Sequence, residues 1–160
     1  MLRRAVVAVG SNVGDRGEHL AKAFEFLRSL HEGPADECLI SPVLETEPVD
    51  CPPGSPVFLN AVASFLSSLQ PLDLLDRLLA FEQTNGRPPV HERNAPRTLD
   101  LDLLLLGDLE WRDDRLTLPH PRWMQRAFVL EPLAEILPHL RPPGSALTIV
   151  QARDALRRLP

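Results

Sequence analysis

Tyrosine is absent from this chain of 160 residues, and lysine occurs once, as Lys22. Cysteine occurs twice, and Cys38 and Cys51 form no Cys-x-x-Cys pattern. Because the spacing typical of redox or zinc-binding cysteines is missing, we expect two free thiols, with a disulfide between them as the minor alternative. With six Phe, two Trp and no Tyr, the aromatic side chains are few enough that each one is informative.

Long apolar runs are also missing. A membrane-spanning helix needs about 20 apolar residues, whereas Leu103–Leu106 is short and stands beside charged residues. Near the N-terminus, two arginines precede a short apolar stretch that continues into Gly10-Ser11-Asn12 without the small-residue cleavage site of a secretory signal. We therefore expect a cytoplasmic protein with no membrane partner.

Positive charge is scarce overall and concentrated in one segment. The formal net charge is −5, which argues against a general nucleic-acid-binding protein. The length and the ordinary share of apolar residues (44%) indicate one globular domain over residues 1–160. The segment from 87 to 97 carries Arg87, Arg93 and Arg97 but only one acid, Glu92. A cationic loop in an acidic protein suits a small polyanion better than a polymer.

The most informative segment follows that loop. Asp100 and Asp102 stand two residues apart in an apolar run that continues into four leucines. In a strand, residues two apart share one face, so both carboxylates point the same way. Two anionic groups beside a core are costly unless a cation neutralises them. The pair therefore predicts a Mg²⁺ site, and Arg97 just upstream suits the phosphates that accompany Mg²⁺.

Two other interpretations of the acidic pair stay open. One is a half-exposed strand whose polar face meets water, although the leucine run is typical of a strand covered on both faces. The other is the Asp-x-Asp pair with which some glycosyltransferases hold a nucleotide-sugar through a metal. The neighbouring arginines favour phosphate chemistry over this second interpretation.

Hydrophobic periodicity predicts an alternating order of elements. Strands are expected over residues 4–9, 37–46 and 58–66 and again from Asp100. One helix is expected after a cap at Asp15 and before Gly33-Pro34, and a second from Pro71 to about Asn85. The order β-α-β-β-α-β is the ferredoxin-like pattern, which places the chain in the α+β class.

A hairpin and further helices are expected beyond this core. Short strands over residues 109–111 and 115–118 flank a turn at Asp113-Asp114. Helical segments are expected around Trp123, over residues 132–137 and over residues 148–159, where Thr148 is a suitable cap.

Several polar and aromatic residues have both a structural and a functional interpretation. Gly10–Gly14 joins a strand to a helix without the Gly-Lys-Ser/Thr ending of a P-loop, so a plain connection is favoured. A second basic group, Arg115, His120, Arg122 and Arg126, follows the acidic strand. Phe58 with Asn60, and likewise Phe128, are suited to a flat heterocycle, but on residue type alone they are ordinary core or strand positions.

Five motifs together resemble the 6-hydroxymethyl-7,8-dihydropterin pyrophosphokinases of folate biosynthesis, from Ala8 to about Pro138. They are Gly10-Ser11-Asn12-x-Gly14-Asp15, Glu45-Thr46-Glu47-Pro48-Val49, Phe58-Leu59-Asn60-Ala61, Pro96-Arg97-Thr98-Leu99-Asp100-Leu101-Asp102 and Leu118-Pro119-His120-Pro121. The resemblance implies transfer of a pyrophosphoryl group from ATP to the hydroxymethyl group of a reduced pterin, with release of AMP, by a monomer acting on small molecules.

The resemblance also implies roles for individual residues. Asp100 and Asp102 would hold two Mg²⁺ ions, and Arg87 and Arg97 would assist the transferring group. The residues implied in ATP binding are Glu82, Arg93, Arg97, Leu103, Arg115, Thr117, His120 and Arg126. The residues implied in pterin binding are Thr46, Val49, Phe58, Asn60 and Phe128.

Two competing classes differ from this expectation in testable ways. A metal-dependent nucleotidyl or glycosyl transferase would share only the acidic pair and would have no use for Phe58 and Asn60 beside a pterin. A ferredoxin-like ligand-sensing module without catalysis would keep its binding after Asp100→Ala.

Overall fold

A computed structural model describes residues 1–12, 14–47, 53–54, 57–85 and 99–160. The core elements, in chain order, are β1 (Arg3–Ser11), α1 (Arg16–Leu30), the 3₁₀ turn η1 (Ala35–Glu37), β2 (Leu39–Ile40), β3 (Leu44–Thr46), β4 (Phe58–Ser67), α2 (Pro71–Thr84) and β5 (Asp100–Leu106). They are followed by β6 (Trp111–Arg112), β7 (Thr117–Leu118), the 3₁₀ turn η2 (Trp123–Gln125), α3 (Ala127–Ile136) and α4 (Ile149–Arg157).

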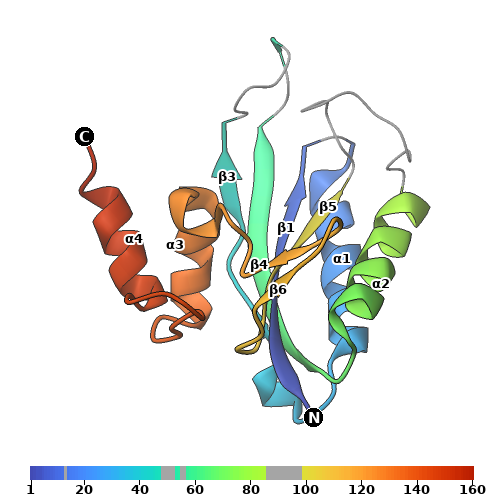
Figure 1. The fold of residues 1–160 in the computed structure, drawn as a ribbon. Helices are drawn as coiled ribbons and strands as arrows, with labels where there is room; N and C mark the ends of the chain where they lie inside the picture. The colour runs from blue at the N-terminus through green and yellow to red at the C-terminus, as the bar shows by residue number, and fades with distance from the viewer. Residues whose placement is uncertain (13, 48–52, 55–56, 86–98) are drawn as a thin grey trace.

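The main sheet is antiparallel and has the order β2-β4-β1-β5, with β3 also paired to β4. The two long central strands run side by side from Arg3↔Ser67 to Ser11↔Leu59. Counting β2 and β3 as one interrupted strand, the order along the chain is β-α-β-β-α-β, which confirms the ferredoxin-like α+β fold predicted from periodicity. The hairpin β6–β7 forms a separate small sheet (Figure 1).

Local signals in the sequence account for the helix boundaries. The side chain of Asp15 caps α1 by accepting a hydrogen bond from the backbone N–H of Glu18, at 3.1 Å. Pro71 opens α2 at a position where no backbone N–H is needed, and the helix ends before Asn85. Thr148 caps α4 in a reciprocal capping box with Gln151.

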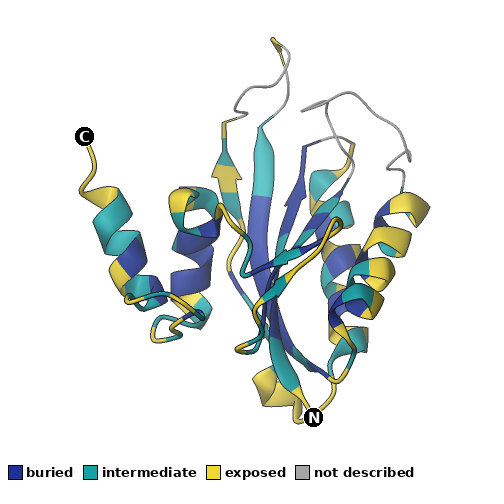
Figure 2. Cartoon of the chain, viewed as in Figure 1, coloured by how far each residue is buried: buried dark blue, intermediate teal, exposed yellow. Residues whose placement is uncertain are grey.

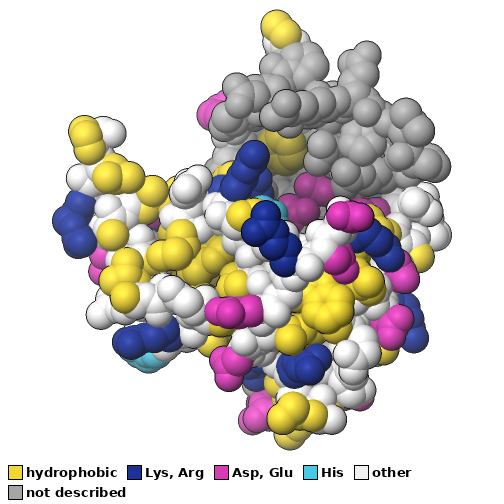
Figure 3. Space-filling model, viewed as in Figure 1, with side chains coloured by type: hydrophobic (Ala, Val, Ile, Leu, Met, Phe, Trp, Pro, Cys, Tyr) yellow, Lys and Arg dark blue, Asp and Glu magenta, His cyan; other side chains and the backbone are white. Residues whose placement is uncertain are grey.

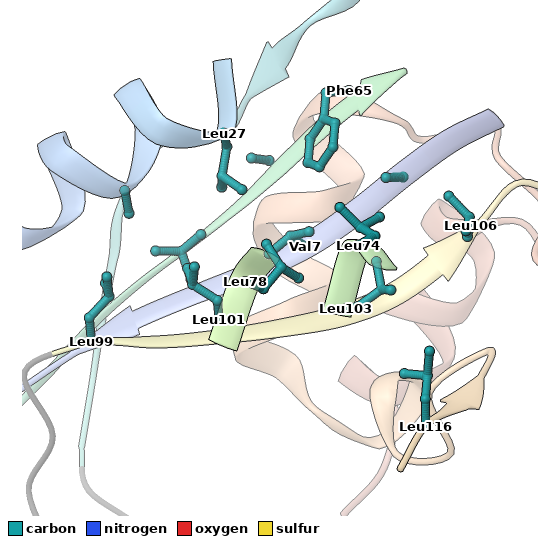
Figure 4. Packing of buried hydrophobic residues seen from close by; sticks show 14 of the residues in the cluster. Val7, Leu27, Phe65, Leu74, Leu78, Leu99, Leu101, Leu103, Leu106 and Leu116 are labelled. Atoms are coloured by element: carbon teal, nitrogen blue, oxygen red, sulfur yellow. The ribbon is translucent and has the colours of Figure 1, made fainter. Parts of the chain in front are cut away.

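Helices α1 and α2 cover one face of the sheet (Figures 1 and 4). Leu27 of α1 and Leu74 and Leu78 of α2 are fully buried against strand residues such as Val7 and Phe65. Figure 2 shows the buried residues of both helices turned toward the sheet. The apolar stripes predicted for these two segments therefore pack on one continuous core.

Helices α3 and α4 cover part of the opposite face. Leu130 and Leu133 of α3 and Ile149 of α4 are fully buried, in one cluster with Val6 of β1 and Leu104 of β5. The leucine run of β5 thus supplies both cores, as expected for a strand covered on two sides. Beyond the reach of α3, this same face is hollow.

Two predicted elements differ from the structure. The single strand expected over residues 37–46 is divided into β2 and β3, because Pro42 lacks the N–H that a continuous ladder requires. The helix expected over residues 132–137 begins five residues earlier, at Ala127, and Pro132 is buried inside it. Pro132, which the sequence predicts as the first helical residue, therefore lies in the interior of the helix, and the first turn is not predicted.

In the part of the chain that the structure describes, no helix combines the length and the apolar character needed to cross a bilayer. Cys38 is a half-buried free thiol, and burial raises its pKa. Cys51 lies outside the described residues.

Candidate active site

The carboxylates of β5 lie on the face of the sheet that faces away from α1 and α2. Asp100 is paired with Gly10 and Asp102 with Ala8 in the ladder between β5 and β1. Leu101 and Leu103 alternate with them and are buried in the core beneath α1 and α2. The alternation therefore places both half-buried aspartates on the hollow side of the sheet, as their spacing predicts.

A cavity of about 1020 Å³ opens on this face. Its size is at the upper end of small-molecule sites, which are about 300–1,000 Å³, so it has room for more than one small ligand. Figure 3 shows acidic and basic side chains gathered around a hollow here. Among the described residues, every one that the sequence assigned to a site lines it: Thr46, Phe58, Asn60, Glu82, Asp100, Asp102, Leu103, Arg115, Thr117, His120, Arg126 and Phe128.

Four assigned residues lie outside the described part of the chain. They are Val49, expected beside the pterin, and the arginines Arg87, Arg93 and Arg97. Their roles stay predictions from the sequence.

One end of the cavity is built from the beginning of β4. Phe58 and Asn60 stand two residues apart on this strand, so their side chains share the cavity face. The amide nitrogen of Asn60 donates a hydrogen bond to the hydroxyl of Thr46 in β3, at 2.6 Å. A Cβ added to Gly10 would lie 3.2 Å from the Asn60 amide oxygen and 4.0 Å from the Phe58 ring. The absence of a side chain at Gly10 therefore leaves room for the Asn60 amide.

Arg126 links this end to the acidic pair. Its guanidinium lies 5.6 Å from the ring centroid of Phe128, in cation–π geometry. One of its nitrogens is 4.0 Å from a carboxylate oxygen of Asp102. The cavity thus places an aromatic ring, a cation and a carboxylate side by side.

Glu82 supports the acidic strand from α2. Its side chain is only 2% exposed, and one carboxylate oxygen accepts a hydrogen bond of 2.6 Å from the backbone N–H of Leu101. Leu101 separates the two aspartates, so this bond fixes the backbone between them. Sequence reasoning placed Glu82 near a nucleotide, and the contact with β5 is a further role that it missed.

The hairpin β6–β7 forms the wall opposite α2. Asp113 holds its turn by accepting hydrogen bonds from the backbone N–H groups of Arg115 and Leu116 and from the Trp111 indole. These bonds lower the pKa of the Asp113 carboxyl, the one from Arg115 most. The guanidinium of Arg115 forms an ion pair with Asp76 of α2. The predicted turn is therefore present, and the hairpin brings Arg115 to the cavity beside Asp113 and Asp114.

His120 follows a cis peptide bond between Leu118 and Pro119. Its backbone N–H donates to the Leu104 carbonyl at 2.9 Å, and its ring Nδ1 accepts from the backbone N–H of Arg122 at 3.2 Å. Burial lowers the pKa of the ring, and the nearby charges of Arg126 and Arg122 lower it further. The ring is consequently neutral at neutral pH, with its proton on Nε2.

The donor set fits a magnesium ion that is shared with a substrate. No cluster of three or more His, Cys, Asp or Glu side chains suited to a metal occurs among the described residues. Mg²⁺ is usually held by one or two carboxylates together with waters and substrate phosphates. Two half-buried carboxylates on the wall of a cavity that also contains arginines match this arrangement.

The cavity also includes residues to which the sequence argument gave no role. Leu75 and Leu79 of α2 line it on the same helix face as Glu82. Their i, i+4, i+7 spacing with Glu82 was the available signal, because it marks a less buried stripe beside Leu74 and Leu78, with Glu82 shared by both since it follows Leu78 by four residues. Gln125 lines the cavity from η2, and no local pattern in the sequence marks it.

Fold and site together define an α+β domain of ferredoxin-like topology whose cavity joins an acidic pair, several arginines and two phenylalanines. The chain belongs to the 7,8-dihydro-6-hydroxymethylpterin-pyrophosphokinase (HPPK) family, whose model matches residues 6–138. The family resemblance seen in the sequence motifs is thereby confirmed.

Curated relatives and solved structures agree with this assignment. A 2-amino-4-hydroxy-6-hydroxymethyldihydropteridine pyrophosphokinase of Pseudomonas aeruginosa is 40% identical over 100% of this chain and 99% of its own. One of the same name from Bacillus subtilis is 39% identical over 82% of this chain and 77% of its own. The crystal structure of wild-type Plasmodium falciparum HPPK-DHPS with SDX-DHP matches with a TM-score of 0.73 at 12% identity. That match covers 97% of this chain but only 44% of the longer one, and it supports the fold alone.

Proposed function

We propose that this chain transfers a pyrophosphoryl group from ATP to 6-hydroxymethyl-7,8-dihydropterin, giving AMP and the pterin diphosphate, in folate biosynthesis. The observation that carries the proposal is the convergence, in a member of this family, of an acidic pair and a recessed amide on one cavity. Asp100 and Asp102 lie on the same face as Asn60 and Phe58, with β1 between the two strands.

The pterin occupies the end of the cavity formed by Phe58 and Phe128. Flat rings stack favourably on aromatic side chains. The buried Asn60 offers donor and acceptor groups to the heterocycle edge, oriented by its bond to Thr46. Val49, close to Thr46 in the sequence, completes this subsite.

The triphosphate lies between the acidic pair, Asp100 and Asp102, and the basic side chains that follow β5 in the sequence. Arg115, His120 and Arg126 line this region, together with Thr117, Leu103 and Glu82. Arg87, Arg93 and Arg97 belong to the segment just before the acidic strand and add positive charge for the nucleotide and the transferring group.

Asp100 and Asp102 would hold two Mg²⁺ ions, and the chemistry supplied there would be neutralisation of the phosphates and a lower pKa of the attacking hydroxyl. The hydroxymethyl oxygen bonds to the β-phosphorus while the bond from that phosphorus to the α,β-bridging oxygen breaks. The hydroxyl proton passes to solvent, and AMP leaves. Arg126, beside Asp102, is placed to stabilise charge on the phosphates as this exchange proceeds.

The remaining parts of the proposal concern the whole chain. Residues 1–160 act as one domain and as a cytoplasmic monomer. The partners are small molecules, with neither nucleic acid nor membrane involved. Light scattering after size exclusion tests the monomer, which would elute at 17.8 kDa.

Product analysis tests the reaction. The protein is incubated with ATP, Mg²⁺ and the hydroxymethyl dihydropterin, and the nucleotides are separated. AMP formed in equal amount to the pterin diphosphate supports the proposal, whereas ADP would identify an ordinary kinase. Asp102→Asn should lower turnover by at least 100-fold, since it removes one charge from the metal site, an effect of about 2.7 kcal/mol on the barrier. Asp108→Asn, at an exposed aspartate outside the cavity, is the matched control and should leave turnover unchanged.

A further inference from the structure

One long-range hydrogen bond connects α1 to the beginning of β4. The guanidinium of Arg16, the first residue of α1, donates to the backbone carbonyl of Val57 at 2.6 Å. The two residues are 41 positions apart, and the contact is partly buried. Arg16 does not belong to the residues that line the cavity, so it reaches this point from outside the site.

The Val57 carbonyl lies just beyond the reach of the sheet. The ladder with β1 ends at Ser11↔Leu59, and the ladder with β3 ends at Thr46↔Phe58. The strand pairing therefore stops before Val57, and the carbonyl of Val57 is bound by Arg16 instead. That unit is planar and contains both the Val57 carbonyl and the Cα of Phe58. Holding the carbonyl therefore fixes the plane from which the Phe58 side chain projects into the cavity.

We infer that Arg16 is a positioning residue for the heterocycle end of the cavity, acting through the Val57–Phe58 peptide. The inference rests on the proposed function, because it takes the pterin as the ligand at Phe58. Phe58 is then held from two directions: by its own pairing with Thr46 and by the anchored peptide that precedes it. The proposed nucleotide end is formed by α2 and the hairpin, and none of the hydrogen bonds or ion pairs of the described residues joins Arg16 to either.

Helix electrostatics separates this role from simple stabilisation of α1. A positive charge in the first turn opposes the helix dipole, so replacing Arg16 should leave the helix itself unchanged or slightly more stable. If the replacement lowers pterin affinity, that loss of affinity must then come from the lost hydrogen bond to Val57. Hydrogen bonds from a charged donor are strong enough for their loss to change an affinity by about tenfold or more.

The test compares Arg16→Gln with Arg28→Gln, an exposed arginine in the last turn of the same helix. For Arg16→Gln we expect the dissociation constant of the pterin, measured by its fluorescence, to rise about tenfold. The dissociation constant of ATP should change less than twofold, and the melting temperature should not fall below that of the Arg28→Gln protein, which loses a favourable charge at the helix C-terminus. Arg16→Lys, which keeps a charged donor, should recover part of the pterin affinity. Equal losses for both ligands, or no loss for either, would overturn the inference.

Hydrogen exchange of the ligand-free protein provides a readout that does not depend on the reaction. The amides of Leu59 and Asn60 should exchange faster in Arg16→Gln than in wild type, and Arg28→Gln should leave them unchanged. Unchanged exchange in Arg16→Gln would refute the anchoring role. If wild-type protein forms no AMP from ATP and the pterin, the proposed function fails, and the exchange rates still decide whether Arg16 anchors β4.

Discussion

At the scale of single residues, the strictest packing constraint in the cavity falls on Gly10. It lies on β1 between Asn60 of β4 and Asp100 of β5, and the closest atom to a Cβ built there is the Asn60 amide oxygen. A strand of small residues at this point leaves the cavity open down to the backbone. Glycine at this position leaves space for the Asn60 amide, and the Gly10 backbone itself has no left-handed conformation that would require glycine.

Gly10→Ala should weaken pterin binding by about tenfold. The added Cβ would lie 3.2 Å from the Asn60 amide oxygen, so the amide must rotate or shift away from its bond with Thr46. Overpacking of this kind costs about 1–3 kcal/mol. Isothermal titration with the pterin measures the effect. Gly17→Ala is the control, because its Cβ would meet only Asp15 at an ordinary 3.8 Å. Unchanged pterin affinity in Gly10→Ala would show that Asn60 does not read the heterocycle.

His120 should make stability fall in mild acid. Burial, Arg126 and Arg122 lower its pKa in the folded protein, whereas the unfolded chain titrates near the ordinary value of about 6.5. The histidine therefore contributes stability that is present above pH 6.5 and is lost as the pH falls toward the folded pKa. Urea unfolding at pH 7.5 and pH 5.5 should show a smaller loss in His120→Gln than in wild type. The exposed His139→Gln protein should behave as wild type, and equal losses in all three would contradict the assignment.

Residue type alone left several of these positions undecided. Alternation shows that Phe58 and Asn60 share a face, but it does not reveal that this face is hollow, because that depends on how much of the sheet α3 covers and on where this helix begins. The pairing of Asp100 and Asp102 was predictable, since two residues on one strand need no tertiary information. The contact of Arg16 with Val57 was not, because it joins residues far apart in the chain through a backbone carbonyl.

At the scale of elements, β5 depends on a side chain from another element. Glu82 of α2 accepts the Leu101 N–H on the outer side of β5, where no strand among the described residues pairs with it. A buried backbone N–H without a partner is costly. By accepting the Leu101 N–H, Glu82 therefore stabilises the part of β5 that lies between Asp100 and Asp102.

Glu82→Ala should lower the free energy of unfolding by about 1–3 kcal/mol, the usual effect of leaving a buried donor unpaired. It should also lower turnover, because the backbone between Asp100 and Asp102 loses its anchor. Glu82→Gln keeps an acceptor oxygen and should retain more of both properties. Urea denaturation and steady-state assays measure the two effects, with the exposed Glu25→Ala as control. If the Ala and Gln variants are equally active and equally stable, Glu82 does not anchor β5.

Among the helices, hydrophobic periodicity predicted the buried faces correctly, whereas proline positions predicted the helix starts only in part. The stripes of α1 and α2 were predictable because each helix buries one face only. Proline was correctly taken as the first residue of α2 and incorrectly as the first residue of a helix at Pro132. The difference lies in the surroundings, since α3 is buried and its packing outweighs the lost backbone hydrogen bond.

At the scale of the whole molecule, the net charge is negative, and so is the described lining of the cavity, where six acids (Glu47, Glu82, Asp100, Asp102, Asp113 and Asp114) outnumber three arginines. The chain carries −5, yet Arg115, Arg122 and Arg126 line the cavity. Because the described lining as a whole is acidic, we expect an anionic nucleotide to be attracted by these individual arginines at short range and not by the mean charge of the lining.

Salt should consequently weaken ATP binding much more than pterin binding. Screening shortens the range of these charges from about 10 Å at 0.1 M salt to about 3 Å at 1 M. Raising KCl across this range should increase the KM for ATP several-fold and leave the KM for the uncharged pterin within about twofold. Steady-state assays in KCl, repeated in potassium glutamate, separate screening from specific chloride binding. Parallel increases in both KM values would show that the arginines do not act on the nucleotide selectively.

The covered flank of β5 also limits the kinds of molecule that can be developed as inhibitors. Peptides and peptidomimetics commonly bind by adding a strand to an open sheet edge. Here Glu82 already engages the Leu101 N–H, and the backbone of His120 engages the Leu104 carbonyl. A strand mimic has to displace both before it reaches the backbone beside the carboxylates. Compounds that enter through the open side of the hollow, such as flat heterocycles linked to an anionic tail, are the better starting chemistry.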